Sequence, residues 1–174
     1  MQIVAKTHDD LVEAVLRLKR EISPNSTDQL IVTFDGWECA GKTCTARKIA
    51  RSLELPHLDL DKFLIPDRGT ILNHVRYDDL ASELESYSQT VLFSGACMRE
   101  VLNRIGLNVP ILTVYVKRMS AEMWADSHLI YPEGEMTVEE FWATGSFSPL
   151  SREMAEYHHE FQPDRTSDIC FLRR

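Results

Sequence analysis

The stretch that most constrains this fold runs from Phe34 to Thr43 and reads FDGWECAGKT. It matches the pattern of Gly, four residues, then Gly-Lys-Ser/Thr, in which successive backbone N–H groups surround phosphate oxygens. The apolar run 30–34 that precedes it is typical of a buried strand, and residues 44–53 favour a helix. Since the loop works between a strand and a helix, the sequence predicts an α/β fold with strand, phosphate loop and helix in succession.

Each residue type in the loop has an expected role. Gly36 permits the tight turn, and Gly41 lets the backbone approach the phosphates closely. Lys42 is expected to reach the β- and γ-phosphates, and the Thr43 hydroxyl to bind Mg²⁺. The ring of Trp37 is expected either to close over the nucleotide or to pack in the interior. The predicted nucleotide-binding residues are Gly36, Trp37, Glu38, Cys39, Ala40, Gly41, Lys42, Thr43 and Cys44.

Composition limits the other classes of function. The chain has 174 residues, 44% of them hydrophobic and 26% charged, as expected for one globular domain spanning 1–174. A net charge of −8 argues against a nucleic-acid-binding surface. No run approaches the about 18 apolar residues of a membrane span, and the first residues lack a signal-peptide core, so a cytoplasmic location is expected. The four cysteines form no CxxC pair and are expected to be reduced thiols.

Hydrophobic periodicity indicates alternating strands and helices, which favours a mostly parallel sheet. A first helix at 8–22 is capped by Thr7 and covers the sheet within an N-terminal segment 1–27. Further helices are predicted at 42–54, 76–88 and 96–105, from Ser120, from Thr137 as a capping box, and from Ser148-Pro149 to Phe161. Strands are predicted at 30–35, 55–61, 90–95, 110–116 and 167–172.

The second predicted strand ends in two carboxylates, Asp59 and Asp61. A two-residue period places both on the same side of the strand, near its C-terminal end. In open parallel sheets that end is where ligands bind. His158 and His159 lack the partners of a zinc site, and Trp124 and Trp142 occupy helical positions, so all four are interpreted as packing or surface residues.

With these segments in place, the chain resembles the P-loop kinases of small metabolites, nearest to the uridine kinase and phosphoribulokinase-like group. The likeness covers about residues 28–172, and the phosphate loop is its most specific part. The run Leu58-Asp59-Leu60-Asp61-Lys62-Phe63 is similar to an Asp-x-Phe signature after the second strand of that group. Two weaker features are the strand 91–95 before a helix and the run 157–163 leading into Ser167-Asp168-Ile169.

The resemblance implies a three-layer sandwich with a five-stranded parallel sheet in the order 2-3-1-4-5 and helices on both faces. It also implies ATP and Mg²⁺ at the C-terminal ends of the strands, and a lid-like helical segment at about 118–150. Asp61 matches the acid that faces the acceptor hydroxyl, in agreement with the need of phosphoryl transfer for a proton acceptor. Catalytic roles are therefore expected for Asp61, Lys42 and Arg118, and metal binding for Thr43 and Asp59.

The acceptor is expected just past Asp61. The predicted substrate-binding residues are Asp61, Phe63, Arg68, Arg76 and Tyr77, and the arginines form either a clamp for an anionic acceptor or a solvated helix start. In the family an acidic residue usually ends the third strand, where this chain has Ser94. Lys117 and Arg118 are the only Lys or Arg between 117 and 151, where the family carries several lid arginines.

These features predict a kinase that transfers the γ-phosphoryl group of ATP to a hydroxyl of a small, nucleoside- or vitamin-like metabolite. One alternative is a nucleotide-type kinase whose acceptor already bears a phosphate. Another is a nucleotide-binding regulator with little turnover, which the sparse lid and Ser94 favour. A switch GTPase is disfavoured because the chain has neither Asn-Lys-x-Asp nor Asp-x-x-Gly. The oligomeric state stays open, with a homodimer as one option.

Overall fold

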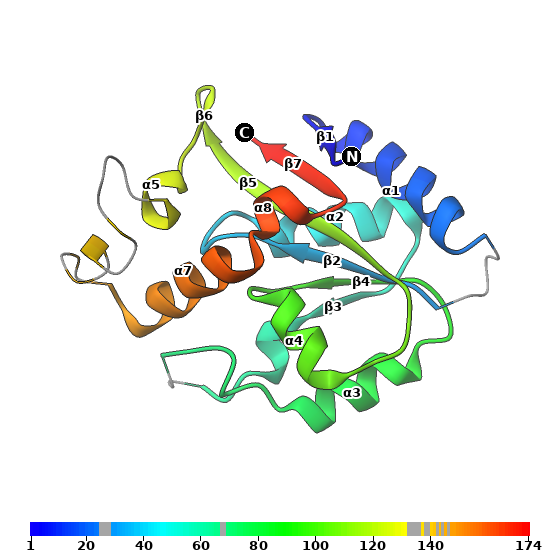
Figure 1. Ribbon diagram of the computed structural model, residues 1–174. Coiled ribbons are helices and arrows are strands. Elements are labelled where there is room, and N and C mark those ends of the chain that lie inside the picture. Colours follow the sequence, from blue (N-terminus) through cyan, green and yellow to red (C-terminus); the bar gives the residue numbers. More distant parts are fainter. Residues whose placement is uncertain are drawn as a thin grey trace.

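A parallel sheet occupies the centre of the computed structural model, with helices on both of its faces (Figure 1). The structure describes residues 1–24, 29–66, 69–131, 137, 140, 141, 143, 145 and 147–174. Arg68, Trp142 and most of the expected lid between 132 and 146 lie outside the described residues.

The sheet has seven strands among the described residues. Its order is β1 (Ile3–Ala5), β7 (Ile169–Arg173), β5 (Ile111–Ser120), β2 (Ile31–Asp35), β4 (Val91–Ser94) and β3 (His57–Asp59). These pairs are parallel, while β6 (Met123–Trp124) pairs with β5 in the antiparallel sense. The expected α/β sheet with helices is confirmed, and the prediction of five strands is wrong. The added strands change the full order: β1 lies outside β7, and β6 lies off the main path.

Two short features explain the missed strands. Strand β1 has three residues and gains its stability from pairing with β7, a partner more than 160 residues away that local sequence does not reveal. The helix expected from Ser120 is wrong, because β5 continues to Ser120 and turns at Ala121, whose φ is 53°. The resulting β-hairpin is held by a 2.9 Å hydrogen bond from the Ala125 N–H to the Arg118 carbonyl.

Side chains alternate between the two faces of the sheet, as a two-residue period requires. Val32 and Phe34 of β2 face a core shared with α1 (His8–Ile22) and α2 (Lys42–Leu53). Ile31 faces the second core, which is covered by α3 (Tyr77–Ser86), α4 (Met98–Ile105) and α7 (Pro149–Phe161). Burial on both faces explains why the central strands read as nearly continuous apolar runs.

Local signals set the helix starts. Thr7 caps α1 through a reciprocal capping box with Asp10, and Ser148 caps α7, in which proline occupies the first turn. Thr137 and Glu140 also exchange hydrogen bonds, with the Glu140 N–H donating to the Thr137 hydroxyl at 3.2 Å. The predicted caps are therefore confirmed at all three positions.

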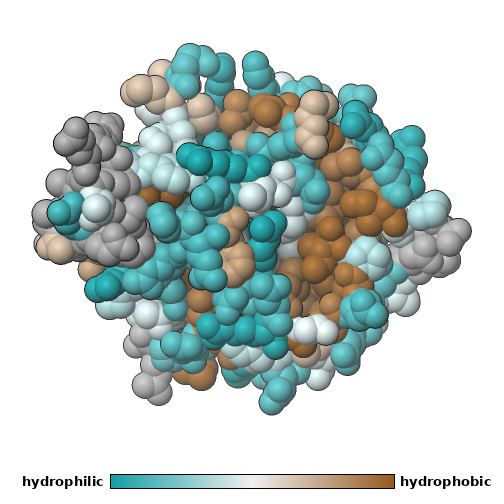
Figure 2. All heavy atoms as spheres, in the orientation of Figure 1, coloured by the Kyte–Doolittle hydropathy of each residue, from teal (hydrophilic) through white to brown (hydrophobic). Residues whose placement is uncertain are grey.

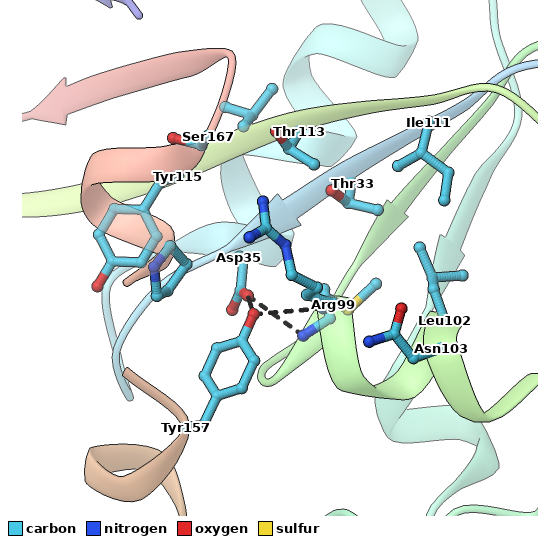
Figure 3. Close-up of a pocket in the computed structure, with 13 residues that line it drawn as sticks. Thr33, Asp35, Arg99, Leu102, Asn103, Ile111, Thr113, Tyr115, Tyr157 and Ser167 are labelled. Carbon is cyan, nitrogen blue, oxygen red and sulfur yellow. Dashed lines mark hydrogen bonds between the residues drawn. The ribbon is translucent and has the colours of Figure 1, made fainter. Parts of the chain in front are cut away.

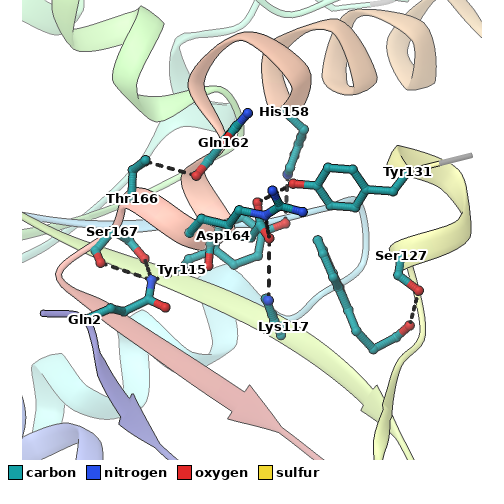
Figure 4. A network of polar contacts seen from close by, with 12 residues as sticks. Gln2, Tyr115, Lys117, Ser127, Tyr131, His158, Gln162, Asp164, Thr166 and Ser167 are labelled. Carbon is teal, nitrogen blue, oxygen red and sulfur yellow. Dashed lines mark hydrogen bonds and ion pairs between the residues drawn. The ribbon is translucent and has the colours of Figure 1, made fainter. Parts of the chain in front are cut away.

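A buried carboxylate fastens the short helix α8 (Pro163–Thr166) to the sheet (Figure 4). Asp164 accepts a 2.8 Å hydrogen bond from the Tyr131 hydroxyl and forms a 3.5 Å ion pair with Lys117 of β5. The Lys117 ammonium also lies 4.3 Å from the centre of the Trp124 ring, so Trp124 packs as expected. This network joins α8 to β5 and to α5 (Ser127–Ile130), at the edge of the expected lid.

Two further findings concern the chain as a whole. Cys39, Cys44, Cys97 and Cys170 are all free thiols. Within the described parts of the chain, none of the helices combines the length and apolar character needed to span a membrane.

Candidate active site

The C-terminal ends of three neighbouring strands bring the candidate polar residues together. Strand β2 ends at Asp35, β3 at Asp59 and β4 at Ser94. The phosphate-loop sequence follows β2 directly, and α2 begins at Lys42. Ligands of open α/β sheets bind at this edge, where crossover connections diverge and the helix N-terminus favours anions.

Backbone geometry explains both glycines of the loop. Gly36 has a φ of 153°, and a Cβ placed there would lie 2.5 Å from the Val116 carbonyl oxygen. Gly41 has a φ of 86°, and its Cβ would lie 2.6 Å from Nε of Arg173. Any larger residue would therefore move the loop away from β5 or displace the arginine.

Lys42 closes the loop on itself. Its Nζ donates a 2.8 Å hydrogen bond to the Trp37 carbonyl across the turn. Burial lowers the pKa of Lys42, while the negative charges of Asp35 and Asp61 oppose that shift. The ammonium is therefore poorly solvated, and its hydrogen-bond acceptor is an uncharged carbonyl. A charged phosphate oxygen would be a stronger acceptor than this carbonyl.

Thr43 belongs to a chain of hydrogen-bonded side chains. The Ser94 hydroxyl donates to the Thr43 hydroxyl at 3.3 Å and lies 2.9 Å from Nε2 of His57. Mg²⁺ coordinates hydroxyl oxygens, and most of its other ligands are usually waters and phosphate oxygens. A single hydroxyl ligand from the protein is therefore compatible with a Mg²⁺ site. Among the residues that the structure describes, here or elsewhere, no group of three or more His, Cys, Asp or Glu could hold a metal ion.

Asp59 and Asp61 have different surroundings. Asp59 is buried at the end of β3, forms a 3.2 Å ion pair with Arg47 of α2, and accepts a 3.4 Å hydrogen bond from the Asp61 N–H. The two-residue alternation, which predicted that Asp59 and Asp61 lie on the same side of the strand, stops at Asp59. A 3₁₀ helix, η1 (Leu60–Phe63), begins directly after it. Asp61 instead faces the cleft beside the loop, where partial burial and the charge of Asp59 raise its pKa and Lys42 lowers it.

The loop and Asp61 share one cleft of about 470 Å³. Its floor is the phosphate loop, and its walls come from η1 and the following segment, from the turn after β4, and from α7. The described residues that line it are Glu38, Cys39, Gly41, Lys42, Thr43, Cys44, Asp61, Leu64, Ile71, Gly95, Ala96, Leu150 and Met154. The structure thus brings together Lys42, Thr43 and Asp61 from two separate parts of the sequence.

Three predicted substrate-binding residues do not line this cleft. The Arg76 guanidinium donates to the Asp79 carboxylate at 2.8 Å and to the Lys62 carbonyl at 2.9 Å. The Tyr77 hydroxyl donates to the Leu72 carbonyl at 2.7 Å. Phe63 is half-buried against the core. In this structure Arg76 and Tyr77 form contacts around the start of α3, and Phe63 packs against the core.

Arg118, the predicted lid cation, is also occupied. Its guanidinium forms an ion pair with the fully buried carboxylate of Asp126, and it does not line the cleft. A buried carboxylate without its cation is costly, so this arginine has a structural partner that it would have to leave in order to reach a phosphate.

Trp37 packs beneath the loop. It is 3% exposed, and its ring lies edge-on to the His158 ring with 5.4 Å between centroids. His158 Nδ1 donates to the Met154 carbonyl at 2.6 Å, so Nε2 accepts from the Tyr115 hydroxyl at 2.7 Å. Burial lowers the pKa of His158, in keeping with this neutral form. Trp37 was expected either to close over the nucleotide or to pack in the interior, and here it packs in the interior. His158 is a packing residue, as expected.

Sequence reasoning missed the residues that brace the loop from below. Oxygens of the buried Asp35 accept from the Gly36 N–H at 2.7 Å, the Met98 N–H at 3.2 Å and the Tyr157 hydroxyl at 2.5 Å. Asp35 could have been singled out because it precedes Gly36. Tyr157 lies 122 residues away; the run 157–163 that contains it was noted only as a weak family feature, without a role beside the loop.

Arg173 was also missed. Its guanidinium, from the end of β7, lies against Gly41 and donates to the Ala40 carbonyl at 3.4 Å. Parallel pairing of β7 with β5 brings this distant residue beside the loop. A second basic side chain therefore stands next to the phosphate loop besides Lys42.

Comparison with known proteins was made by sequence and by structure. No protein-family model and no curated protein matches the sequence. A possible uridine kinase from Bacillus stearothermophilus is similar in structure, with a TM-score of 0.50 at 11% identity over 93% of this chain and 99% of that one. Weaker similarities are to a shikimate kinase from Aquifex aeolicus (TM-score 0.42, 17% identity, 82% and 86% coverage) and a gluconokinase from Sinorhizobium meliloti (0.44, 13%, 86% and 83%). The resemblance to P-loop small-molecule kinases is thereby confirmed at the level of the fold.

Proposed function

We propose that this protein is an ATP- and Mg²⁺-dependent kinase that phosphorylates a hydroxyl group of a small, nucleoside- or vitamin-like metabolite. The observation that carries the proposal is the placement of Lys42, Thr43 and Asp61 on one cleft. A phosphate-binding loop alone is common to many nucleotide-binding proteins. Phosphoryl transfer to a hydroxyl also needs a proton acceptor, and the partly desolvated carboxylate of Asp61 across the same cleft would serve as one.

Each residue has a role that follows from its contacts. The amides of the loop and the start of α2 would hold phosphate oxygens, and Lys42 would exchange the Trp37 carbonyl for one of them. Thr43 would bind Mg²⁺, with Ser94 orienting its hydroxyl. The contact of Asp59 with Arg47 favours a supporting role for Asp59 over direct metal binding.

Bound MgATP would supply the γ-phosphoryl group. Asp61 would accept the proton of the acceptor hydroxyl as its oxygen bonds to phosphorus, and the bond from that phosphorus to the leaving ADP oxygen breaks. A carboxylate whose pKa is raised is a better base than an ordinary aspartate. The charge balance of the cleft favours a neutral acceptor, because Lys42 is the one cation among its described lining residues and is accompanied by Glu38 and Asp61.

A regulator with little turnover is the second candidate. The specific observation that favours it is the engagement of Arg118 with Asp126 and of Arg76 with Asp79, which leaves few cations for the transition state. Arginines that stabilise the charge of the transferred group can contribute about 10³–10⁵ in kcat. A chain without a free one would bind nucleotide and turn it over slowly.

The two candidates separate in one assay. The full chain is incubated with MgATP and a panel of nucleosides, vitamins, sugars and antibiotics, and ADP is measured with and without each acceptor. A kinase shows ADP production that depends on one acceptor and is lost in Asp61→Asn. Tight MgATP binding with the same slow ADP production in every mixture would contradict the proposal and favour the regulator.

A further inference from the structure

A second cavity lies on the sheet face opposite α2, and it shares no lining residue with the nucleotide cleft. Its volume is about 330 Å³, and it opens between α4 on one side and α8 on the other, over β2 and β5 (Figure 3). Cavities of about 300–1,000 Å³ are the usual size for small organic ligands. Figure 2 shows a largely hydrophobic band on this face of the molecule, beside the start of β5.

Most of the cavity wall is apolar. Met98 and Leu102 of α4 face it from one side, Ile111 of β5 forms part of its floor, and Pro163 of α8 closes the far side. Such a surface gains free energy when a hydrocarbon or aromatic group covers it. The body of a suitable ligand is therefore apolar.

The carboxylate at one end of the cavity is already hydrogen-bonded within the protein. The Asp35 carboxylate already accepts hydrogen bonds from two backbone N–H groups and from the Tyr157 hydroxyl. Three donors hold its charge in place. The Thr113 hydroxyl is likewise engaged, with the Asp168 carboxylate at 2.7 Å.

Arg99 is the polar group that remains available. It is half-buried at the start of α4, and its side chain extends into the cavity over β2 (Figure 3). Among the described residues, no carboxylate forms an ion pair with its guanidinium and no oxygen accepts a hydrogen bond from it. By contrast, Arg104 one turn and a half later on the same helix is paired with Glu100. A guanidinium beside an apolar wall binds a carboxylate through two parallel hydrogen bonds.

We propose that this cavity binds a small organic carboxylate, with its apolar body against Met98, Leu102 and Ile111 and its carboxylate on Arg99. The site shares no lining residue with the cleft of the proposed kinase chemistry. Such a ligand would lie beside Asp35, one residue before the phosphate loop.

The test uses 2-naphthoate as the probe and 2-naphthamide as its uncharged match. The full chain, labelled at Leu, Ile and Val methyl groups, is titrated with each compound by NMR. Saturable shifts of the Leu102 and Ile111 signals are expected with 2-naphthoate, with a Kd at least tenfold below that of the amide. Arg99→Gln should raise the Kd of 2-naphthoate at least tenfold, or about 1.4 kcal/mol, and leave that of the amide unchanged.

Two further variants fix the location. Arg152→Gln, on the exposed face of α7, is the matched control and should change neither Kd. Asn103→Trp, at the exposed rim of the cavity, should weaken both compounds by closing the mouth. Equal affinity for the acid and the amide, no effect of Arg99→Gln, or no saturable shift at these methyl groups would each overturn the proposal. Shifts that depend on protein concentration alone would place a second copy over the cavity and would overturn it as well.

Discussion

The ammonium of Lys42 donates its hydrogen bond to the carbonyl of Trp37, 2.8 Å away within the same loop. The loop thus holds its principal cation over the turn that phosphate oxygens would fill. Because burial lowers the pKa of this ammonium, exchange of a carbonyl for a charged phosphate oxygen is favourable. Nucleotide binding and the breaking of this bond are therefore expected to occur together.

Lys42→Ala is expected to weaken MgATP binding at least tenfold, or about 1.4 kcal/mol, because no other described residue of the cleft supplies a positive charge. Calorimetric titration of the full chain measures the change. Lys48→Ala, an exposed lysine on the same helix, is the control and should bind MgATP normally. Unchanged affinity in Lys42→Ala would remove the loop from the proposed site.

Asp61→Asn should lower kcat by at least about 100-fold, since general-base catalysis typically contributes about 10²–10⁴-fold, while MgATP affinity stays within a few-fold. Burial and the charge of Asp59 raise the pKa of Asp61 above 3.8, so the wild-type kcat should fall as the pH drops through that raised value. The remaining kcat of Asp61→Asn should not show this decline at low pH. Asp59→Asn, which disturbs the Arg47 ion pair, should have the smaller effect on kcat. The opposite order would mean that the two carboxylates are reversed.

Ser94→Ala should raise the Mg²⁺ concentration required for half-maximal ADP production. The substitution removes a hydrogen bond to the Thr43 hydroxyl, and one such bond is worth about 1 kcal/mol, or roughly fivefold. Magnesium titrations at saturating ATP give the value. Ser52→Ala, on the exposed side of α2, should behave as the wild type. An unchanged Mg²⁺ requirement in Ser94→Ala would argue that Thr43 needs no orienting partner.

Arg173→Ala should reduce MgATP affinity at least threefold, or about 0.7 kcal/mol, because the guanidinium beside Gly41 adds positive potential at the phosphate loop. The difference from wild type should shrink as salt is raised, since screening weakens such interactions. Arg174→Ala provides the comparison, because that side chain pairs with Glu122 at the surface. Equal losses in the two variants would indicate a general charge effect.

His158 should make stability depend on pH. Burial lowers the pKa of His158 below its ordinary 6.5, so below that pH the unfolded chain binds a proton that the folded chain resists. The contribution of neutral, buried His158 to the free energy of unfolding is therefore fully present above pH 6.5 and declines as the pH falls below that value. Urea unfolding at pH 7.5 and 5.5 should show a smaller decline in His158→Gln than in wild type. His159→Gln, exposed on the same helix, should retain the wild-type decline.

The predicted α/β class and helix starts depended on local signals that survive in the structure. Thr7 and Ser148 begin helices because their side chains satisfy N–H groups of the first turn within three residues. The glycines of the loop follow from backbone geometry that few other residues adopt. The helix expected from Ser120 rested on Met123, Trp124 and His128 and is wrong, because pairing of β5 with β6 across a turn at Ala121 stabilises a hairpin instead.

The sequence by itself determined the phosphate loop, the strand before it and the helix after it, because these depend on residues within about ten positions of one another. Only the tertiary structure decided which charges are free. Arg118 and Arg76 have partners, Arg173 reaches the loop from β7, and Arg99 faces a separate cavity. The physical reason is that ion pairs and cavities form between segments far apart in the chain, and composition and spacing carry no information about which of those segments meet.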